Sequence, residues 1–195
     1  MTFTTTQTAT RITHPPTRRT TALAALIKAA TYVVGFAAMG AYLVPRGFVA
    51  ATVAPAESLG FLLANATVMY VWYLVLYVVG GLALVWLVIG IEARLREAGA
   101  GTGASASRAI GLAWAGLLLS SGLIALVGRA AVIRLALAES ELAVSTWTAI
   151  SVVQEALGGG IEIVGAVWVL LVSLAGLRAA AVGRGLATLG VLVAV

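Results

Sequence analysis

The stretch QEALGGGIEIVGAVW, from Gln154 to Trp168, holds side chains that could do chemistry within an otherwise apolar segment. Glu155 and Glu162 are seven residues apart and therefore share one face of a helix, with three consecutive glycines between them. A carboxylate inside a bilayer is costly unless it is paired, protonated or in contact with water. Glu162 is therefore a candidate for an intramembrane polar site.

The composition is typical of an integral membrane protein. The chain is 62% hydrophobic and 10% charged, against roughly 25% charged residues in a soluble domain. It has no cysteine and one histidine, which argues against thiolate metal sites, a histidine zinc site and a haem held by two histidines. No histidine or aspartate in the apolar part could activate a nucleophile. We therefore expect no catalytic residue, metal or cofactor. The basic residues form no patch, which argues against nucleic-acid binding.

Four apolar runs are long enough for the roughly 20 residues of a spanning helix. They are Thr21–Val44, Phe61–Ile91, Ala109–Val127 and Trp147–Leu177, and a shorter run covers 186–195. We predict an all-α polytopic bundle with four spanning helices and a partial fifth, which either ends inside the membrane or continues in a longer chain. Residues 1–20 are threonine-rich, contain two prolines and no acid, and are predicted to form a disordered cytoplasmic tail.

The lysines and arginines predict a cytoplasmic N-terminus, because they concentrate on the side of the tail. With this orientation the cytoplasmic set is Arg11, Arg18, Arg19, Lys28, Arg94, Arg96, Arg108, Arg178 and Arg184, and the outer set is Arg46, Arg129 and Arg134. Lys28 is close enough to the inner end of the first helix for its side chain to extend to the headgroups.

The second and fourth runs exceed the length of a span, and we expect the second to fourth helices to extend past the outer headgroups as a small cap. The linker REAGAGTGASASR is small and polar and is expected to be flexible. Tyr70, Tyr73 and Tyr77 share one face of the second helix. They form either an interfacial belt or the lining of a lipid or quinone slot.

Helix lengths predict which charges meet inside the membrane. Counted at 1.5 Å per residue, Glu162 lies about 24 Å from Arg178, and Arg129 lies about 31 Å from Arg108 on the preceding helix. This places Arg129 at a depth between Glu155 and Glu162. We predict an ion pair between Arg129 and Glu162, which either locks the two helices together or forms part of a functional site.

The glycines beside this pair have two interpretations. Gly158, Gly159, Gly160 and Gly165 expose backbone where a neighbouring helix can pack closely, and the run of three weakens the helix by roughly 1 kcal/mol per residue relative to alanine. We expect a kink or a close helix crossing just before Glu162. The alternative is a hinge or a place where a ligand approaches the backbone.

The run GGGIEIVGAVWVLLVSLAGLR resembles a segment of small bacterial multi-pass membrane proteins classed as a domain of unknown function. The matching residues are Gly159, Gly160, Glu162, Gly165, Trp168, Leu170, Leu171 and Arg178. This chain lacks the proline that often follows the arginine in that family. The resemblance implies a bacterial cytoplasmic (inner) membrane protein and implies no activity.

Two classes of function follow from these observations. The first, which we favour from sequence, is a non-enzymatic protein in the lipid bilayer that acts through helix packing, as a homo-oligomer or with a membrane partner subunit. The second is a small transporter or channel in which Glu162 handles a proton or a cationic solute. A water-accessible cavity that reaches Glu162 would favour the second.

Overall fold

The computed structural model describes residues 17–48, 54–138, 141–159 and 161–194. Within these ranges every regular element is helical, and four helical stretches are long and apolar enough to cross a membrane. They are Arg18–Arg46, Ala66–Glu97, Gly101–Leu137 and Leu142–Arg178. The structure confirms the predicted all-α fold class, whereas the cytoplasmic position of the N-terminus stays a prediction.

The four stretches contain regular and irregular parts. The first comprises α1 (Arg18–Ala38), the π-helical turn η1 (Met39–Leu43) and the 3-10 turn η2 (Val44–Arg46). A short helix, α2 (Pro55–Ala64), precedes the second, which comprises α3 (Ala66–Tyr73), the π-helical η3 (Leu74–Val79) and α4 (Gly80–Glu97). The third is α5 (Gly101–Leu137). The fourth comprises α6 (Leu142–Gly158) and α7 (Glu162–Arg178), and α8 (Arg184–Ala194) follows it.

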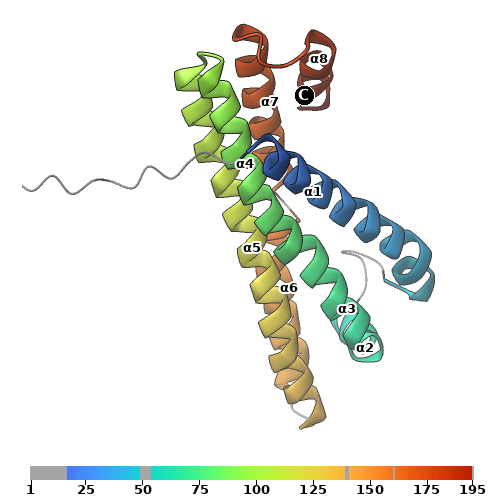
Figure 1. The fold of residues 1–195 in the computed structure, drawn as a ribbon. Helices are drawn as coiled ribbons and strands as arrows, with labels where there is room; N and C mark the ends of the chain where they lie inside the picture. Colours follow the sequence, from blue (N-terminus) through green and yellow to red (C-terminus); the bar gives the residue numbers. More distant parts are fainter. Residues whose placement is uncertain (1–16, 49–53, 139–140, 160, 195) are drawn as a thin grey trace, which may run out of the picture.

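The long helix α5 is the centre of the arrangement (Figure 1). It packs against α4 and α7 along its first half and against α6 along its second half. The helix α1 packs on α4 and diverges from the bundle, while α8 folds back beside α7. Small residues allow α1 to approach α4, because a β-carbon added at Gly90 would overlap the Thr21 side chain.

The second predicted run is divided in the structure. One helix over Phe61–Ile91 was expected, but the chain leaves the helical conformation at Asn65, with φ −124° and ψ 25°, and α2 is separate from α3. The Asn65 side chain donates a hydrogen bond to the Phe61 carbonyl oxygen at 3.1 Å. Asparagine competes with the helix for such backbone groups, which explains the end of α2 at this position.

The third helix is longer than the predicted Ala109–Val127. With 37 residues, α5 is about 55 Å long and extends to Leu137; the outer cap stays a prediction. The prediction of a flexible linker before this helix was wrong, because α5 already begins at Gly101. The turn from α4 is tight and uses a left-handed residue, Gly99, with φ +87°.

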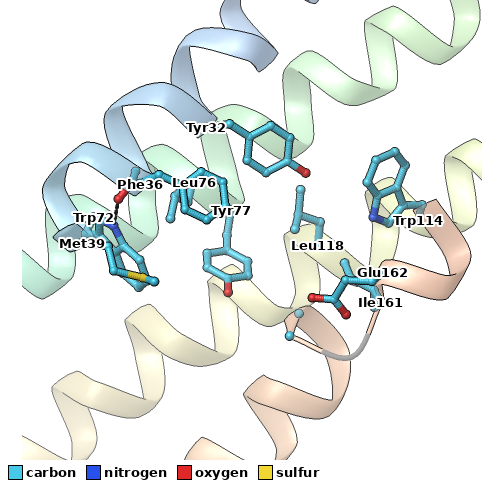
Figure 2. A pocket seen from close by; sticks show the side chains of 13 residues that line it. Tyr32, Phe36, Met39, Trp72, Leu76, Tyr77, Trp114, Leu118, Ile161 and Glu162 are labelled. Carbon is cyan, nitrogen blue, oxygen red and sulfur yellow. Dashed lines mark hydrogen bonds between the residues drawn. The ribbon is translucent and has the colours of Figure 1, made fainter. Parts of the chain in front are cut away.

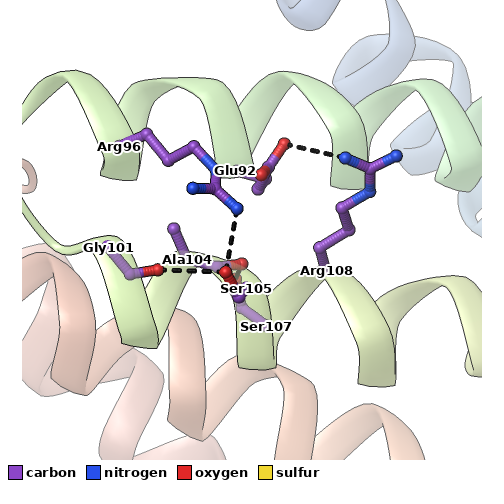
Figure 3. Close-up of polar contacts among 7 residues, drawn as sticks. All are labelled: Glu92, Arg96, Gly101, Ala104, Ser105, Ser107 and Arg108. Carbon is purple, nitrogen blue, oxygen red and sulfur yellow. Dashed lines mark hydrogen bonds and ion pairs between the residues drawn. The ribbon is translucent and has the colours of Figure 1, made fainter.

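An acidic side chain fastens the α4–α5 turn (Figure 3). Glu92 is buried on α4 and forms ion pairs with Arg96 of the same helix and with Arg108 of α5, the latter at 3.6 Å. Arg96 also donates a hydrogen bond to the Ser105 hydroxyl at 2.8 Å. These contacts join α4 to α5. We call the four residues Glu92, Arg96, Ser105 and Arg108 the α4–α5 clasp; they lie where a flexible linker was expected.

The two ends of the chain differ in part from the prediction. Residues 1–16 lie outside the described residues, but Arg18–Thr20 form the first turn of α1, so the predicted tail extends three residues too far. Thr17 caps this turn, since its side-chain oxygen accepts a hydrogen bond from the Thr20 amide at 3.3 Å. The partial fifth helix is present as α8, which ends at Ala194.

Candidate functional site

The fourth predicted run is two helices rather than one. Where a single helix over Trp147–Leu177 was expected, α6 ends at Gly158 and α7 begins at Glu162. Consecutive glycines are poor helix formers, which explains the break at this position. Glu162 is therefore the first residue of α7.

Gly158 and Gly165 lie at close contacts between helices. A β-carbon added at Gly158 would overlap the Ser121 hydroxyl, and one at Gly165 would lie 2.9 Å from the Trp114 ring. At Gly159 a β-carbon would meet only the preceding turn of its own helix, at 3.0 Å from Glu155. Gly160 lies outside the described residues. The break is thus held against α5 on both sides by glycine contacts.

A cavity of about 260 Å³ borders the break (Figure 2). Its walls come from α1, η1, α3, η3, α5 and the α6–α7 junction, and Glu162 is one of the lining residues. Figure 2 shows the Glu162 carboxylate at the edge of this space, with Tyr32 and Tyr77 across from it. Three more aromatic side chains line it: Phe36, Trp72 and Trp114.

The amide Gln154, which precedes the break by one turn, is the polar centre of the neighbouring packing. Its side chain is buried, accepts a hydrogen bond from the Tyr73 hydroxyl at 3.0 Å, and donates one to the Ser121 hydroxyl at 3.3 Å. Ser121 in turn donates to the Gln154 carbonyl oxygen at 2.9 Å. The residue types in the sequence pointed to the neighbouring Glu155, which is exposed, rather than to Gln154. An uncharged amide in an apolar run is the signal that could have identified it.

The predicted ion pair between Arg129 and Glu162 is wrong. Arg129 is only 5% exposed, its guanidinium lies 3.5 Å from the centre of the Tyr73 ring and 5.4 Å from that of Trp147, and it donates to the Met69 carbonyl oxygen at 3.5 Å. In the described part of the chain, Arg129 forms no ion pair with an acidic side chain. It connects α5 to α3 and α6 through aromatic rings.

The reason for the error is the register of α7 along α5. The depth count placed Arg108 level with Arg178. In the structure, a β-carbon on Gly103 would lie 2.8 Å from Ala175, so Arg178 is level with the very start of α5. Compared with the depth count, α7 lies about 10 Å further toward the start of α5. Glu162 is therefore too far from Arg129 to form the ion pair.

Lys28 also differs from expectation, because its side chain does not extend to the end of the helix. It is 5% exposed, and its ammonium lies 4.0 Å from the centre of the Tyr32 ring and 5.9 Å from that of Trp114. The ammonium has no hydrogen-bond partner among the described residues. The aromatic side chains that hold it are two of those that line the cavity.

The three tyrosines expected on one face of the second helix have different surroundings in the structure. Tyr70 is exposed, Tyr73 is buried between Arg129 and Tyr77, and Tyr77 lines the cavity. The helix contains the π-helical η3 after Tyr73, which changes the angular spacing that the sequence count assumed. Only Tyr70 has the exposure that an interfacial belt requires, and Tyr77 has the position that the lining of a slot requires.

No protein-family model, curated protein or solved structure matches the chain. The resemblance to bacterial membrane proteins of unknown function therefore stays a prediction, and functional inference depends on the geometry of the site.

Proposed function

We propose that the protein is a small membrane carrier that binds a cationic solute at Glu162, inside the bilayer. The observation that supports this most directly is the cavity between α1, η3, α5 and the helix break, with this carboxylate at its edge. An intramembrane acid that borders a cavity fits a solute or ion pathway better than a helix-packing role. For this reason we now prefer the carrier to a function through helix packing or a partner subunit.

Three irregular helical segments meet at this cavity. Met39 belongs to the π-helical η1, Tyr77 belongs to the π-helical η3, and Glu162 follows the α6–α7 break. Single π-helical turns occur often at functional sites, and discontinuous helices commonly form the solute sites of transporters. Three such features around one space support a binding site there.

The electrostatics of the break favour a positively charged solute. The last turn of α6 ends at Gly158, which lines the cavity together with Gly159 and Glu162. The carbonyl end of α6 carries partial negative charge, and the amide end of α7, at Glu162, carries partial positive charge, so the two helix ends offset each other. The Glu162 carboxylate is therefore the group that a cation in the cavity would meet.

The helix α1 forms a wall of the cavity and diverges from the bundle (Figure 1). Its main contacts outside its own stretch are with α4 and η3, on one side of the cavity, while Glu162 lies on the other side. A carrier must expose its site to each side of the membrane in turn. Movement of α1 about its contacts with α4 would change access to Glu162 without disturbing the packing of α5 with α6 and α7.

The four apolar helices indicate a membrane protein. We place it in the bacterial cytoplasmic membrane with the N-terminus inside, which rests on the sequence resemblance and on the distribution of lysine and arginine.

Transport in proteoliposomes tests the proposal. Purified protein is reconstituted and uptake is measured separately for protons, Rb⁺ and benzyltrimethylammonium. At least one probe should enter faster than in protein-free vesicles, and Glu162→Gln should abolish the difference. Glu155→Gln is the matched control, because Glu155 is exposed on the same stretch and does not line the cavity.

The carrier proposal fails if none of the three probes is transported, or if Glu162→Gln transports as well as Glu155→Gln. If no probe is transported and Glu162→Gln instead dissociates an oligomer of the wild-type chain, the carboxylate serves subunit contact and the homo-oligomer hypothesis is correct.

A further inference from the structure

We infer that the solute is an organic ammonium ion with apolar substituents, rather than a proton or a metal cation. The inference rests on the proposed function and specifies the chemical class bound at Glu162. It is carried by the carboxylate and the aromatic side chains that line the cavity.

The aromatic side chains around the cavity are held in fixed positions. The Trp72 indole donates a hydrogen bond to the Gly35 carbonyl oxygen at 2.9 Å (Figure 2). Tyr77 is stacked on Tyr73, with ring centres 5.1 Å apart. Rings that are already ordered lose little conformational entropy when a ligand binds between them. Such rings attract a cation through their electron-rich faces.

Three further rings line the cavity: Tyr32 and Phe36 on α1, and Trp114 on α5 beside the start of α7. Trp114 lies beside Trp168, with ring centres 5.7 Å apart, and Tyr32 lies beside Phe36, with ring centres 6.1 Å apart. With a carboxylate and several aromatic rings in one lining, the cavity offers charge neutralisation and apolar contact together. An organic ammonium ion uses both.

The side-chain nitrogen of Lys28 packs against the Tyr32 ring from outside the cavity lining. Its ammonium lies 4.0 Å from the Tyr32 ring centre and has no hydrogen-bond partner among the described residues, so the ring contact is its main polar interaction. Lys28 itself does not line the cavity. Its charge nevertheless opposes a second cation near Trp114, whose ring centre is 5.9 Å from the ammonium.

The same lining is unsuited to a dehydrated metal cation. Hard cations take six or more oxygen ligands, whereas the cavity's side-chain oxygens are the Glu162 carboxylate and the hydroxyls of Tyr32 and Tyr77. Among the described residues, no group of three acidic or histidine side chains could hold a metal ion. The cavity is also slightly smaller than the roughly 300 Å³ of the smallest typical ligand pockets, which favours an ammonium ion with one ring or a few short alkyl groups.

Calorimetric titration of the purified protein in lipid nanodiscs tests the inference. Benzyltrimethylammonium should bind, while its uncharged carbon analogue neopentylbenzene should bind at least about tenfold more weakly, and K⁺ should neither bind nor compete. Glu162→Gln should weaken benzyltrimethylammonium binding by about tenfold or more, with Glu155→Gln unchanged. Trp114→Leu should weaken it several-fold.

Lys28 provides a further variant, because it lies outside the cavity lining and its charge opposes a cation near Trp114. Lys28→Met should strengthen benzyltrimethylammonium binding several-fold, whereas Lys28→Arg, which keeps the charge, should not. The inference is overturned if neopentylbenzene binds as well as the ammonium ion, if Trp114→Leu has no effect, or if Lys28→Met weakens binding. If only protons or Rb⁺ are transported, dependent on Glu162, the inference fails while the carrier proposal stands.

Discussion

Gly158 of α6 packs so closely against Ser121 of α5 that a β-carbon at this glycine would overlap the serine hydroxyl. The contact fixes the end of α6, and with it the position at which the chain breaks before Glu162. The geometry of the cavity therefore depends on a helix contact that only glycine permits.

Replacement of Gly158 by alanine should lower the melting temperature in detergent. The added methyl group must displace Ser121 or Tyr77, and such overpacking typically costs about 1–3 kcal/mol. Gly116→Ala is the matched control on α5, since a β-carbon there meets no other atom within 4 Å. Equal melting temperatures for the two variants would show that the α5–α6 contact is looser than described.

Replacement of Gln154 by leucine should also destabilise the protein, by about 1–3 kcal/mol, because it leaves the Tyr73 hydroxyl buried without its acceptor. Combined with Tyr73→Phe, which removes that hydroxyl, the loss should be smaller than the sum of the two single losses. Thermal unfolding of the four proteins measures this coupling. Strict additivity would mean that the hydrogen bond between Tyr73 and Gln154 does not contribute.

Arg129 and Glu162 should behave as independent residues. Because Arg129 is held by Tyr73 and Trp147 and not by the acid, the effects of Arg129→Gln and Glu162→Gln on unfolding should add to within about 0.5 kcal/mol in the double variant. Recovery of stability in the double variant would contradict this and would restore the ion pair expected from helix lengths.

The orientation of the bundle is tested by reporters at its two ends. Alkaline phosphatase fused after Arg96, in the α4–α5 clasp, should be inactive, and the same enzyme inserted beside Glu141, before α6, should be active. These results follow from the excess of basic residues on the cytoplasmic side. The opposite pattern at both positions would mean that the N-terminus lies outside.

The class of protein and the existence of four apolar helices could be predicted because both follow from composition and length. The position of the break was indicated by three glycines next to an acid. These features depend on residues close together in the sequence, through the low helix propensity of glycine and the cost of an acid in the membrane.

The partners of the charged residues could not be predicted in the same way. Whether Arg129 meets Glu162 depends on how far α7 is shifted along α5, and that register is set by contacts such as Gly103 with Ala175. The direction of Lys28 depends on the position of the Tyr32 ring, and Gln154 is buried only because Tyr73 and Ser121 meet at it. Each of these is a contact between helices distant in sequence, which helix length and periodicity do not specify.

Cysteine accessibility tests the central claim that the cavity beside Glu162 is a solute site. The chain has no cysteine, so a single Leu118→Cys variant places one thiol in the cavity wall and leaves Glu162 intact. A water-soluble methanethiosulfonate reagent should modify this thiol, and benzyltrimethylammonium should slow the reaction, but not when Glu162→Gln is also present. Val127→Cys, which is exposed on the same helix outside the cavity, should show no protection. An unreactive thiol at position 118, or one that the cation protects equally with and without the carboxylate, would contradict a cation site at Glu162.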